Sequence, residues 1–505
     1  INQRLGKGAL IVNYTGHGGE TGWTHERILE ISDINSWTNY DRLPVFMTAT
    51  CEFSRYDDPL RKSGGELVFL NPRGGGIALF TTARPTFGTP NFNLARNFYN
   101  IALKPDGNGK PFLGDLIRIS KRVTGSDPNS KKFVLLGDPA MKMAYPAFNV
   151  FTTEINGRTV NGDADTLRAL GEITINGIIA DDNRNILSGF NGVVTATVFD
   201  KVSQVNTFGS DGAAPMSFSL RRNIIYKGNV IVEDGRFSFS FIVPRDIGYQ
   251  FGQGKISYYA SDGEQDAAGH YNDIVIGGIS NKNLDDYDGP EISLFMNNTA
   301  FRSGGFTDEN PVLLALLKDI SGINTIGNSI GHDIVAILDG KTESPFILND
   351  YYQSDLNTYK SGKVAFPFKN LAPGLHTLRL KAWDVNNNSA EASIEFYVAS
   401  SEEMLIGSFD AYPNPMNDYT RFEFDHNQSG QDLEVTLRIF SLSGALVAVL
   451  NRTIFADGFR TTAFEWDGRN NQGRLLSAGF YIGNLQVTSS SGLQAAESVK
   501  ISVVR

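Results

Sequence analysis

Two short apolar runs near the start of the chain limit the folds that are open to it. Residues 9–14 read ALIVNY, and residues 43–50 read LPVFMTAT. Each run is short, apolar and partly β-branched, which is typical of a strand buried on both faces of a parallel sheet. The segment between them is long enough for a helix to carry the chain back to a second parallel strand. The sequence therefore predicts an α/β domain at this end.

Each apolar run is followed by a residue that can do chemistry. His17 lies in the glycine-rich turn after the first run, and Cys51 comes directly after the second. Ligands of such sheets bind beyond the carboxyl ends of the strands. A thiolate attacks a carbonyl carbon, and an imidazole holds or moves the proton. A single Cys is usually a small buried apolar group, but the matching positions of the pair favour a nucleophilic site.

Length and composition set further limits. The 505 residues predict three to four domains. Abundant Gly (52), Phe (34) and Tyr (18) favour β-rich sandwiches. The net charge of −10 argues against a nucleic-acid partner. With one Cys, no internal disulfide can form, and no apolar run approaches the ~18 to 20 residues of a membrane span.

Four motifs in order resemble those of gingipain-type cysteine peptidases, which are caspase-like enzymes. They are YTGHGGETGW (14–23), ATCEF (49–53), SGGE (63–66) and LGDPA (136–140). The resemblance implies a caspase-like or gingipain-like α/β catalytic domain over residues 1–147. It also implies that Cys51 is the nucleophile and His17 the acid/base, with an oxyanion hole formed by the backbone N–H groups of Gly18 and Cys51.

Other residues are weaker candidates for this site. Substrate contacts are expected from residues near the same sheet edge, namely Glu20, Glu52, Thr82 and Arg84. Asp138 fits a turn cap better than a third catalytic group. In the gingipain family the acidic partner of the histidine lies upstream of the His-Gly motif. Because the chain starts at Ile1, we expect an N-terminal part of the domain to be missing. We expect no cofactor and no metal.

Several elements of this domain are also predicted. Ser63 and Glu66 fit a capping box that starts a short helix. A crossover helix over 26–36, helices over 93–103 and 112–123, and strands over 77–82 and 133–136 complete the prediction.

From about Phe148 the chain alternates with a period of two, which predicts antiparallel strands. We expect β-sandwiches over 148–280, 281–400 (immunoglobulin-like) and 401–505. An acidic stretch joins the first two and contains Asp285, Asp286 and Asp288. Such a stretch suggests a Ca²⁺ site, but the spacing is irregular, so a solvated linker is favoured. His332, before a strand, is expected to be structural.

The last hundred residues contain a second set of ordered motifs. AYPNP (411–415), EWDG (465–468) and AGFY (478–481) resemble the C-terminal sorting domain of type IX secretion cargo. Residues 317–324 and 331–334 resemble the middle region of the sortase of that system. These resemblances imply a cysteine endopeptidase and transpeptidase on the cell surface, associated with the outer membrane of a Gram-negative bacterium.

The implied reaction uses Cys51 to cut exported proteins before their sorting domain. The thioester would then pass the new carboxyl end to an amine of an anionic lipopolysaccharide, or to water. The implied partners are the C-terminal sorting domains of secreted proteins, an outer-membrane partner such as PorV, and the lipopolysaccharide acceptor.

Two alternatives remain. The first is a secreted gingipain-like endopeptidase specific for basic residues, which would need a strongly acidic pocket. The second is an inactive surface-binding homologue, against which the intact pair of His17 and Cys51 argues. Labelling of Cys51 by a thiol-reactive peptide probe would distinguish an enzyme from a binding protein.

Overall fold

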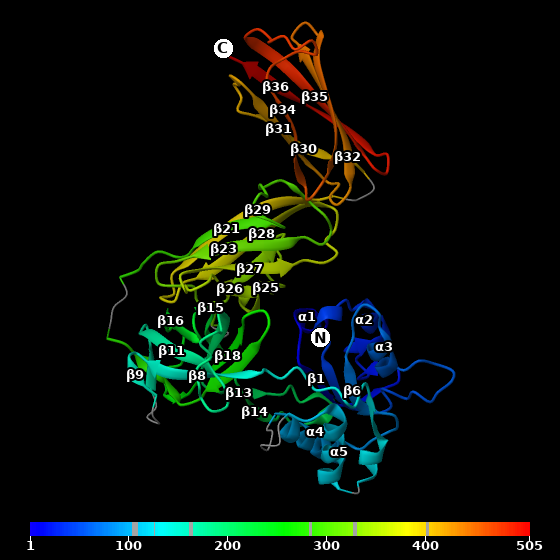
Figure 1. Cartoon of the computed structure of the whole chain (residues 1–505), viewed down its shortest axis with the longest axis vertical. Helices are drawn as coiled ribbons and strands as arrows, with labels where there is room; N and C mark the ends of the chain where they lie inside the picture. The colour runs from blue at the N-terminus through cyan, green and yellow to red at the C-terminus, as the bar shows by residue number, and fades with distance from the viewer. Residues whose placement is uncertain are drawn as a thin grey trace. The chain divides into compact units, whose positions relative to one another are not determined.

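The chain forms two compact units, Ile1–Pro146 and Ala147–Arg505, which are described separately (Figure 1). The computed structural model describes residues 1–103, 110–125, 127–160, 165–281, 285–326, 331–399 and 403–504. The first unit ends where the alternating sequence pattern begins. The domain boundaries expected near residues 280 and 400 stay predictions, because both fall within the second compact unit.

The first unit is built on a four-stranded sheet in the order β1-β5-β6-β7. Its strands are β1 (Ile11–Thr15), β5 (Val45–Ala49), β6 (Ala78–Thr82) and β7 (Phe133–Leu136). The strands β1, β5 and β6 run parallel, and β7 is antiparallel to β6. Every residue of β5 and β6 is buried, as predicted for apolar strands that are covered on both faces of the sheet. The parallel α/β sheet expected from the sequence is therefore confirmed.

Helices cover both faces of this sheet. They are α1 (Asn2–Lys7), α2 (Ile31–Ser36), α3 (Gly64–Leu70), α4 (Gly88–Leu103) and α5 (Leu113–Thr124). On one face, Met47 and Phe80 pack against Phe98 of α4 and Leu116 of α5. On the other face, Phe46 shares a core with residues of α1, α2 and α3. The helices expected over 93–103 and 112–123 are confirmed, with an earlier start for the first.

The crossover helix expected over 26–36 is mostly wrong. Only α2 is helical, and a small sheet of β2 (Gly18–Gly19), β3 (Gly22–Trp23) and β4 (Leu29–Glu30) takes the chain to it. Trp23 and Leu29 are buried, whereas Ile28 is half exposed. The apolar positions of this segment therefore do not share one helical face.

The second unit contains only strands and short 3-10 turns among its described residues. An eight-stranded sheet, ordered β15-β12-β18-β19-β8-β11-β16 with β9 beside β8, shares a core with the sheet β10-β20-β17. The strands of the large sheet are β8 (Phe148–Ile155), β9 (Arg158–Thr159), β11 (Glu172–Ala180), β12 (Gly192–Phe199), β15 (Ile224–Val232), β16 (Arg236–Ile242), β18 (Lys255–Ser261) and β19 (Asp266–Tyr271). Those of the smaller sheet are β10 (Asp165–Ala169), β17 (Gly252–Gln253) and β20 (Ile274–Ile279), and β13 (Ser203–Asn206) pairs with β14 (Ser217–Leu220).

A second core lies between the sheets β21-β23-β27-β26 and β22-β29-β28-β24-β25. Their strands are β21 (Glu291–Met296), β22 (Phe306–Thr307), β23 (Val312–Lys318), β24 (Val335–Leu338), β25 (Phe346–Ile347), β26 (Tyr352–Ser354), β27 (Ser361–Pro367), β28 (Gly374–Trp383) and β29 (Ser389–Val398).

A third core lies between the sheets β30-β31-β34 and β33-β32-β35-β36. Their strands are β30 (Ile406–Tyr412), β31 (Thr420–His426), β32 (Asp432–Ser441), β33 (Leu446–Phe455), β34 (Arg460–Trp466), β35 (Gly479–Ser489) and β36 (Gln494–Val503).

The acidic stretch before β21 differs from the expected solvated linker at one residue. Asp285 and Asp288 are exposed, but Asp286 is only 5% exposed. The linker prediction is therefore wrong for Asp286, whose surroundings are described below. None of the described helices combines the length and the apolar character needed to cross a membrane.

Candidate active site

The strands β1 and β5 bring His17 and Cys51 to the same edge of the first sheet. The two strands are parallel neighbours, and Thr15 at the end of β1 pairs with Ala49 at the end of β5. Each candidate residue lies two positions beyond its strand. Gly16 N–H donates to the Ala49 carbonyl at 3.3 Å, so the two strand ends stay joined as they enter their turns. His17 is exposed and Cys51 is half buried.

The turn that carries His17 is held by its own backbone. The His17 carbonyl accepts hydrogen bonds from the Tyr14 hydroxyl at 2.5 Å and from Thr24 N–H at 2.9 Å. The Tyr14 ring stacks on buried Trp23, with ring centroids 4.4 Å apart. Trp23 therefore anchors the turn from the far side of the β2–β3 hairpin.

Gly18 is placed against the turn that precedes Cys51. A Cβ atom on Gly18 would lie 2.5 Å from the Thr50 Oγ1 atom and 3.0 Å from the Gly22 carbonyl oxygen. Only glycine allows the His17 and Cys51 turns to approach this closely. The use of the Gly18 backbone N–H in an oxyanion hole stays a prediction.

Thr86 contacts the Cys51 sulfur; it lies in the segment 83–86, which the sequence places at the same sheet edge as His17 and Cys51. Its N–H donates to Sγ at 3.4 Å, and its hydroxyl donates to the Thr50 carbonyl at 3.0 Å. The Asn91 side chain in turn donates to Thr86 Oγ1 at 2.8 Å. A backbone N–H aimed at the sulfur stabilises negative charge there. The only sequence signal for Thr86 was its place just beyond β6.

Thr82 and Glu52 have supporting positions around Cys51. Thr82 is fully buried, and its hydroxyl donates to the Thr50 carbonyl at 2.5 Å, so it fixes the Cys51 turn from β6. Glu52 has a φ of +50°, an uncommon conformation for a residue other than glycine. Its carboxylate is 3.9 Å from the Arg55 guanidinium. The turn after Cys51 is therefore sharply bent.

Glu20 and Arg84 each have charged partners within the site. The Glu20 carboxylate lies 2.8 Å from Arg55 and 3.2 Å from Arg61. Arg84 is exposed and forms a two-pronged ion pair with Asp57. Its hydrogen bonds lower the pKa of Asp57 below the ordinary value.

A cavity of about 700 Å³ opens beside His17. Its walls come from residues 17–32 and include Gly18, His25 and Arg27. The rings of His17 and His25 lie 6.5 Å apart, centroid to centroid. Among the described residues the lining includes His17 but not Cys51. The cavity therefore adjoins the imidazole side of the pair.

Asp138 caps a turn and is not part of the pair. Its Oδ1 atom accepts a hydrogen bond from Ala140 N–H at 2.8 Å. The prediction of a turn cap is confirmed.

Comparison with known proteins gives one family and several structures. The model of peptidase family C25 matches residues 1–144. No curated protein matches the chain. The chain is similar to dimeric latent PorU from Porphyromonas gingivalis, at 30% identity over 86% of this chain and 41% of that one, with a TM-score of 0.34. It is also similar to the Arg-specific cysteine proteinase gingipain R, at 16% identity over 54% of each chain, with a TM-score of 0.27.

The chain thus spans about two fifths of the length of the PorU structure that it matches. The family match covers all four motifs that resemble gingipain-type enzymes, so that resemblance is confirmed. Residues 1–144, with His17 and Cys51 at the ends of neighbouring parallel strands, thus match the model of peptidase family C25, a family of cysteine peptidases.

Proposed function

We propose that this chain cleaves peptide bonds through Cys51, with His17 as the acid/base. The observation that carries the proposal is the placement of both residues two positions beyond adjacent parallel strands. The Cys51 thiolate would attack the carbonyl carbon of the scissile bond. The imidazolium of His17 would give its proton to the leaving amine, and a thioester would remain on Cys51. The Gly18 N–H would face the oxyanion.

The finer proposal is a sortase that acts on type IX secretion cargo at the outer-membrane surface. A thioester makes transfer possible, because an acceptor amine can enter after the first product has left. The motifs in residues 411–481 support an export context, because they resemble the sorting domain of such cargo. The proposed substrates are the sorting-domain junctions of secreted proteins, with a lipopolysaccharide amine as acceptor and PorV as a docking partner.

The alternative specificity for basic residues would need a carboxylate that is free to pair with the substrate. Glu20 is matched by Arg55 and Arg61, and Asp57 is matched by Arg84, so neither of these two carboxylates is free. We expect the acidic residues of such a pocket to lie upstream of the His17 motif, so this alternative stays open.

The test is intact-mass analysis of a model cargo that carries a type IX sorting domain. The cargo would be incubated with the full chain and a glycine-like amine. We expect a product that lacks the sorting domain and gains the mass of the amine, and we expect no product with Cys51→Ala. A product that lacks the sorting domain and gains only water would show that the protein is a peptidase that does not transfer its substrate to an amine. Cuts after Arg or Lys throughout the cargo would support the general endopeptidase.

A peptide probe with a thiol-reactive group separates an enzyme from a binding protein. We expect the probe to label Cys51 in the wild type, and to label His17→Ala far more slowly because no imidazole activates the thiol. Release of the sorting domain by Cys51→Ala would contradict the proposal outright. Absence of both product and labelling in the wild type would favour the inactive homologue.

A further inference from the structure

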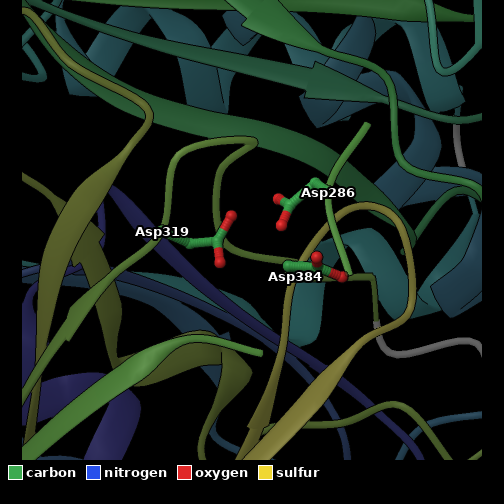
Figure 2. Close-up of side chains that lie close together, drawn as sticks. All are labelled: Asp286, Asp319 and Asp384. Carbon is green, nitrogen blue, oxygen red and sulfur yellow. The ribbon is translucent and has the colours of Figure 1, made fainter. Parts of the chain in front are cut away.

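Three carboxylates from distant parts of the chain meet in the second β-sheet pair of the second unit. Asp286 precedes β21, Asp319 follows β23, and Asp384 follows β28. One oxygen from each lies within 4.8 Å of those of the other two. All three side chains are buried, with exposed fractions of 5%, 8% and 0%. Figure 2 shows the three carboxyl groups facing one another from three separate segments.

Backbone donors hold two of these carboxylates in place. Asp319 Oδ1 accepts hydrogen bonds from the N–H groups of Ser321 at 2.8 Å and Gly322 at 3.1 Å. Asp384 Oδ1 accepts from the N–H groups of Asn386 at 3.0 Å and Asn388 at 2.6 Å. Both loops therefore fix their carboxylates before any ligand arrives.

Asp286 is the residue that indicates a missing ligand. Its backbone carbonyl accepts hydrogen bonds from the side-chain amides of Asn386 at 2.8 Å and Asn388 at 3.0 Å, so its position is fixed. Its Oδ1 atom accepts a long hydrogen bond, 3.3 Å, from Asp288 N–H. Its Oδ2 atom is buried and has no hydrogen-bond partner among the described residues. A buried carboxylate oxygen without a partner is costly to folding.

The charge of the cluster is also uncompensated. Among the residues that the structure describes, none of the three carboxylates forms an ion pair with Lys, Arg or His. Three buried carboxylates without a countercharge repel one another, and a bound cation would relieve that repulsion.

We propose that Asp286, Asp319 and Asp384 bind a Ca²⁺ ion. Calcium prefers oxygen ligands at ~2.3 to 2.6 Å, so two oxygens on opposite sides of one ion lie up to about 5.2 Å apart. The spacing of the three oxygens fits this limit. Mg²⁺ needs a tighter octahedral shell at ~2.0 to 2.1 Å and usually keeps several waters. A buried site with three carboxylates therefore suits Ca²⁺ better.

The site would fasten the segment before β21 to the sandwich that follows it. Asp286 belongs to that segment, whereas Asp319 and Asp384 belong to loops at the ends of β23 and β28. The amides of Asn386 and Asn388 already hold the Asp286 backbone against the second loop. Calcium would add the bond that the side chain lacks, so removal of the ion should loosen this junction first.

The first experiment is a calorimetric Ca²⁺ titration of the full chain after dialysis against EGTA. Asp286→Asn removes the carboxylate that lacks a partner, and Asp288→Asn is the matched control, since that side chain is exposed in the same segment. We expect the wild type and Asp288→Asn to bind with equal affinity. We expect Asp286→Asn to lose one equivalent or bind roughly tenfold or more weakly. Equal stoichiometry and affinity in Asp286→Asn would overturn the site, and tighter binding of Mg²⁺ than of Ca²⁺ would overturn the ion.

Melting temperatures give a second test, because the order of the wild type and Asp286→Asn should differ between EGTA and CaCl₂. In EGTA, Asp286→Asn should melt at or above the wild type, because one repelling charge is gone. In saturating CaCl₂ the order should reverse, because only the wild type gains the full stabilisation of the bound ion. If Asp286→Asn does not fold, hydrogen exchange of the wild type replaces this comparison: EGTA should raise exchange in residues 285–290 and 384–388. No response of the wild type to EGTA would contradict the proposal.

Discussion

At the residue scale, the two glycines after His17 differ in the room they leave for a side chain. A Cβ on Gly18 would lie 2.5 Å from Thr50 Oγ1, whereas a Cβ on Gly19 has no neighbouring atom within 4 Å. Neither residue has a φ in the left-handed region. The difference is therefore one of space alone, and it concerns the gap between the His17 turn and the Cys51 turn.

We expect Gly18→Ala to lower kcat/KM by up to about 100-fold, because a small misplacement of reacting groups has effects of that size. Gly19→Ala should lower it little. The measurement is hydrolysis of a peptide substrate, with binding of the thiol-reactive probe as a check that Cys51 is still accessible. Thr50→Ala added to Gly18→Ala should recover part of the loss, because it removes the closest atom. Equal effects of the two glycine changes would show that the contact with Thr50 does not matter.

The sequence predicted that His17 and Cys51 lie at the same edge of the sheet. Both residues follow apolar runs that predict parallel strands, and the carboxyl ends of neighbouring parallel strands lie at one edge. It could not predict the contact of Thr86 with the Cys51 sulfur, nor the partners of Glu20. Thr86 reaches the sulfur only after β6 lies beside β5, and Arg55 and Arg61 reach Glu20 across a turn. Those contacts depend on folded positions and leave no periodic signal.

At the scale of elements, the short helix α3 supports the turn after Cys51. Ser63 and Glu66 form the capping box that the sequence predicted, with Ser63 N–H donating to Glu66 Oε2 at 2.8 Å. Gly65 N–H donates to the Phe53 carbonyl at 2.7 Å, and a Cβ there would overlap the Ser54 side chain. The start of α3 therefore packs directly on the turn that follows the nucleophile.

Ser63→Ala should destabilise this helix by about 1 kcal/mol, the usual cost of losing a serine cap. The structural reason is that the N–H groups of the first turn lose their side-chain acceptor. Hydrogen exchange of residues 64–70 measures the change locally. Ser32→Ala, at an exposed serine of α2, is the matched control and should leave protection unchanged. Equal losses in both variants would argue against the cap.

Elements with strong patterns were predictable, and elements with weak patterns were not. The fully buried β5 lies in the apolar run that predicted it, and the largely alternating β12 and β16 lie in the stretch where alternation predicted antiparallel strands. The small strands β2, β3 and β4 were missed. Each has two residues, and their stability comes from Trp23 and Leu29 packing beneath the sheet. Such a strand has too few residues to show a period.

At the scale of the whole molecule, the third core of the second unit contains a buried histidine. His426 is fully buried, its Nε2 bonds Thr461 Oγ1 at 2.9 Å, and its Nδ1 accepts from Gln428 N–H at 3.2 Å. Burial lowers the pKa of His426 to about 4, against the smaller opposing effect of Asp425. An acceptor role for Nδ1 also requires the neutral ring.

This histidine should make the third core sensitive to acid. Its folded pKa lies below the ordinary value of 6.5, so the unfolded chain binds the proton more tightly between 6.5 and about 4. Stability therefore falls as the pH drops through this window, by at most about 3 kcal/mol. Scanning calorimetry across that range should show the loss in the wild type and in His270→Gln, where the histidine is exposed. A wild-type pH profile kept by His426→Gln would contradict the assignment.

The β-rich character of the second unit followed from alternation, but the carboxylate cluster did not. Asp286, Asp319 and Asp384 are separated by long stretches of sequence and meet only when three loops converge. The spacing of Asp285, Asp286 and Asp288 along the chain was uninformative, because a single member of that trio is buried. Sites assembled from distant loops require the folded chain to be recognised.

The two turns of the candidate site are held by different partners, and this should make them respond differently to heat. The Thr50 carbonyl, next to Cys51, accepts hydrogen bonds from Thr82 of β6 and from Thr86, whereas the His17 carbonyl is bonded to Tyr14 and Thr24 of its own strand and hairpin. A turn held mainly by its own hairpin opens at lower cost than one bonded to neighbouring segments. Warming should therefore displace the imidazole while the nucleophile's strand is still folded. Inactivation would then precede unfolding and would reverse on cooling.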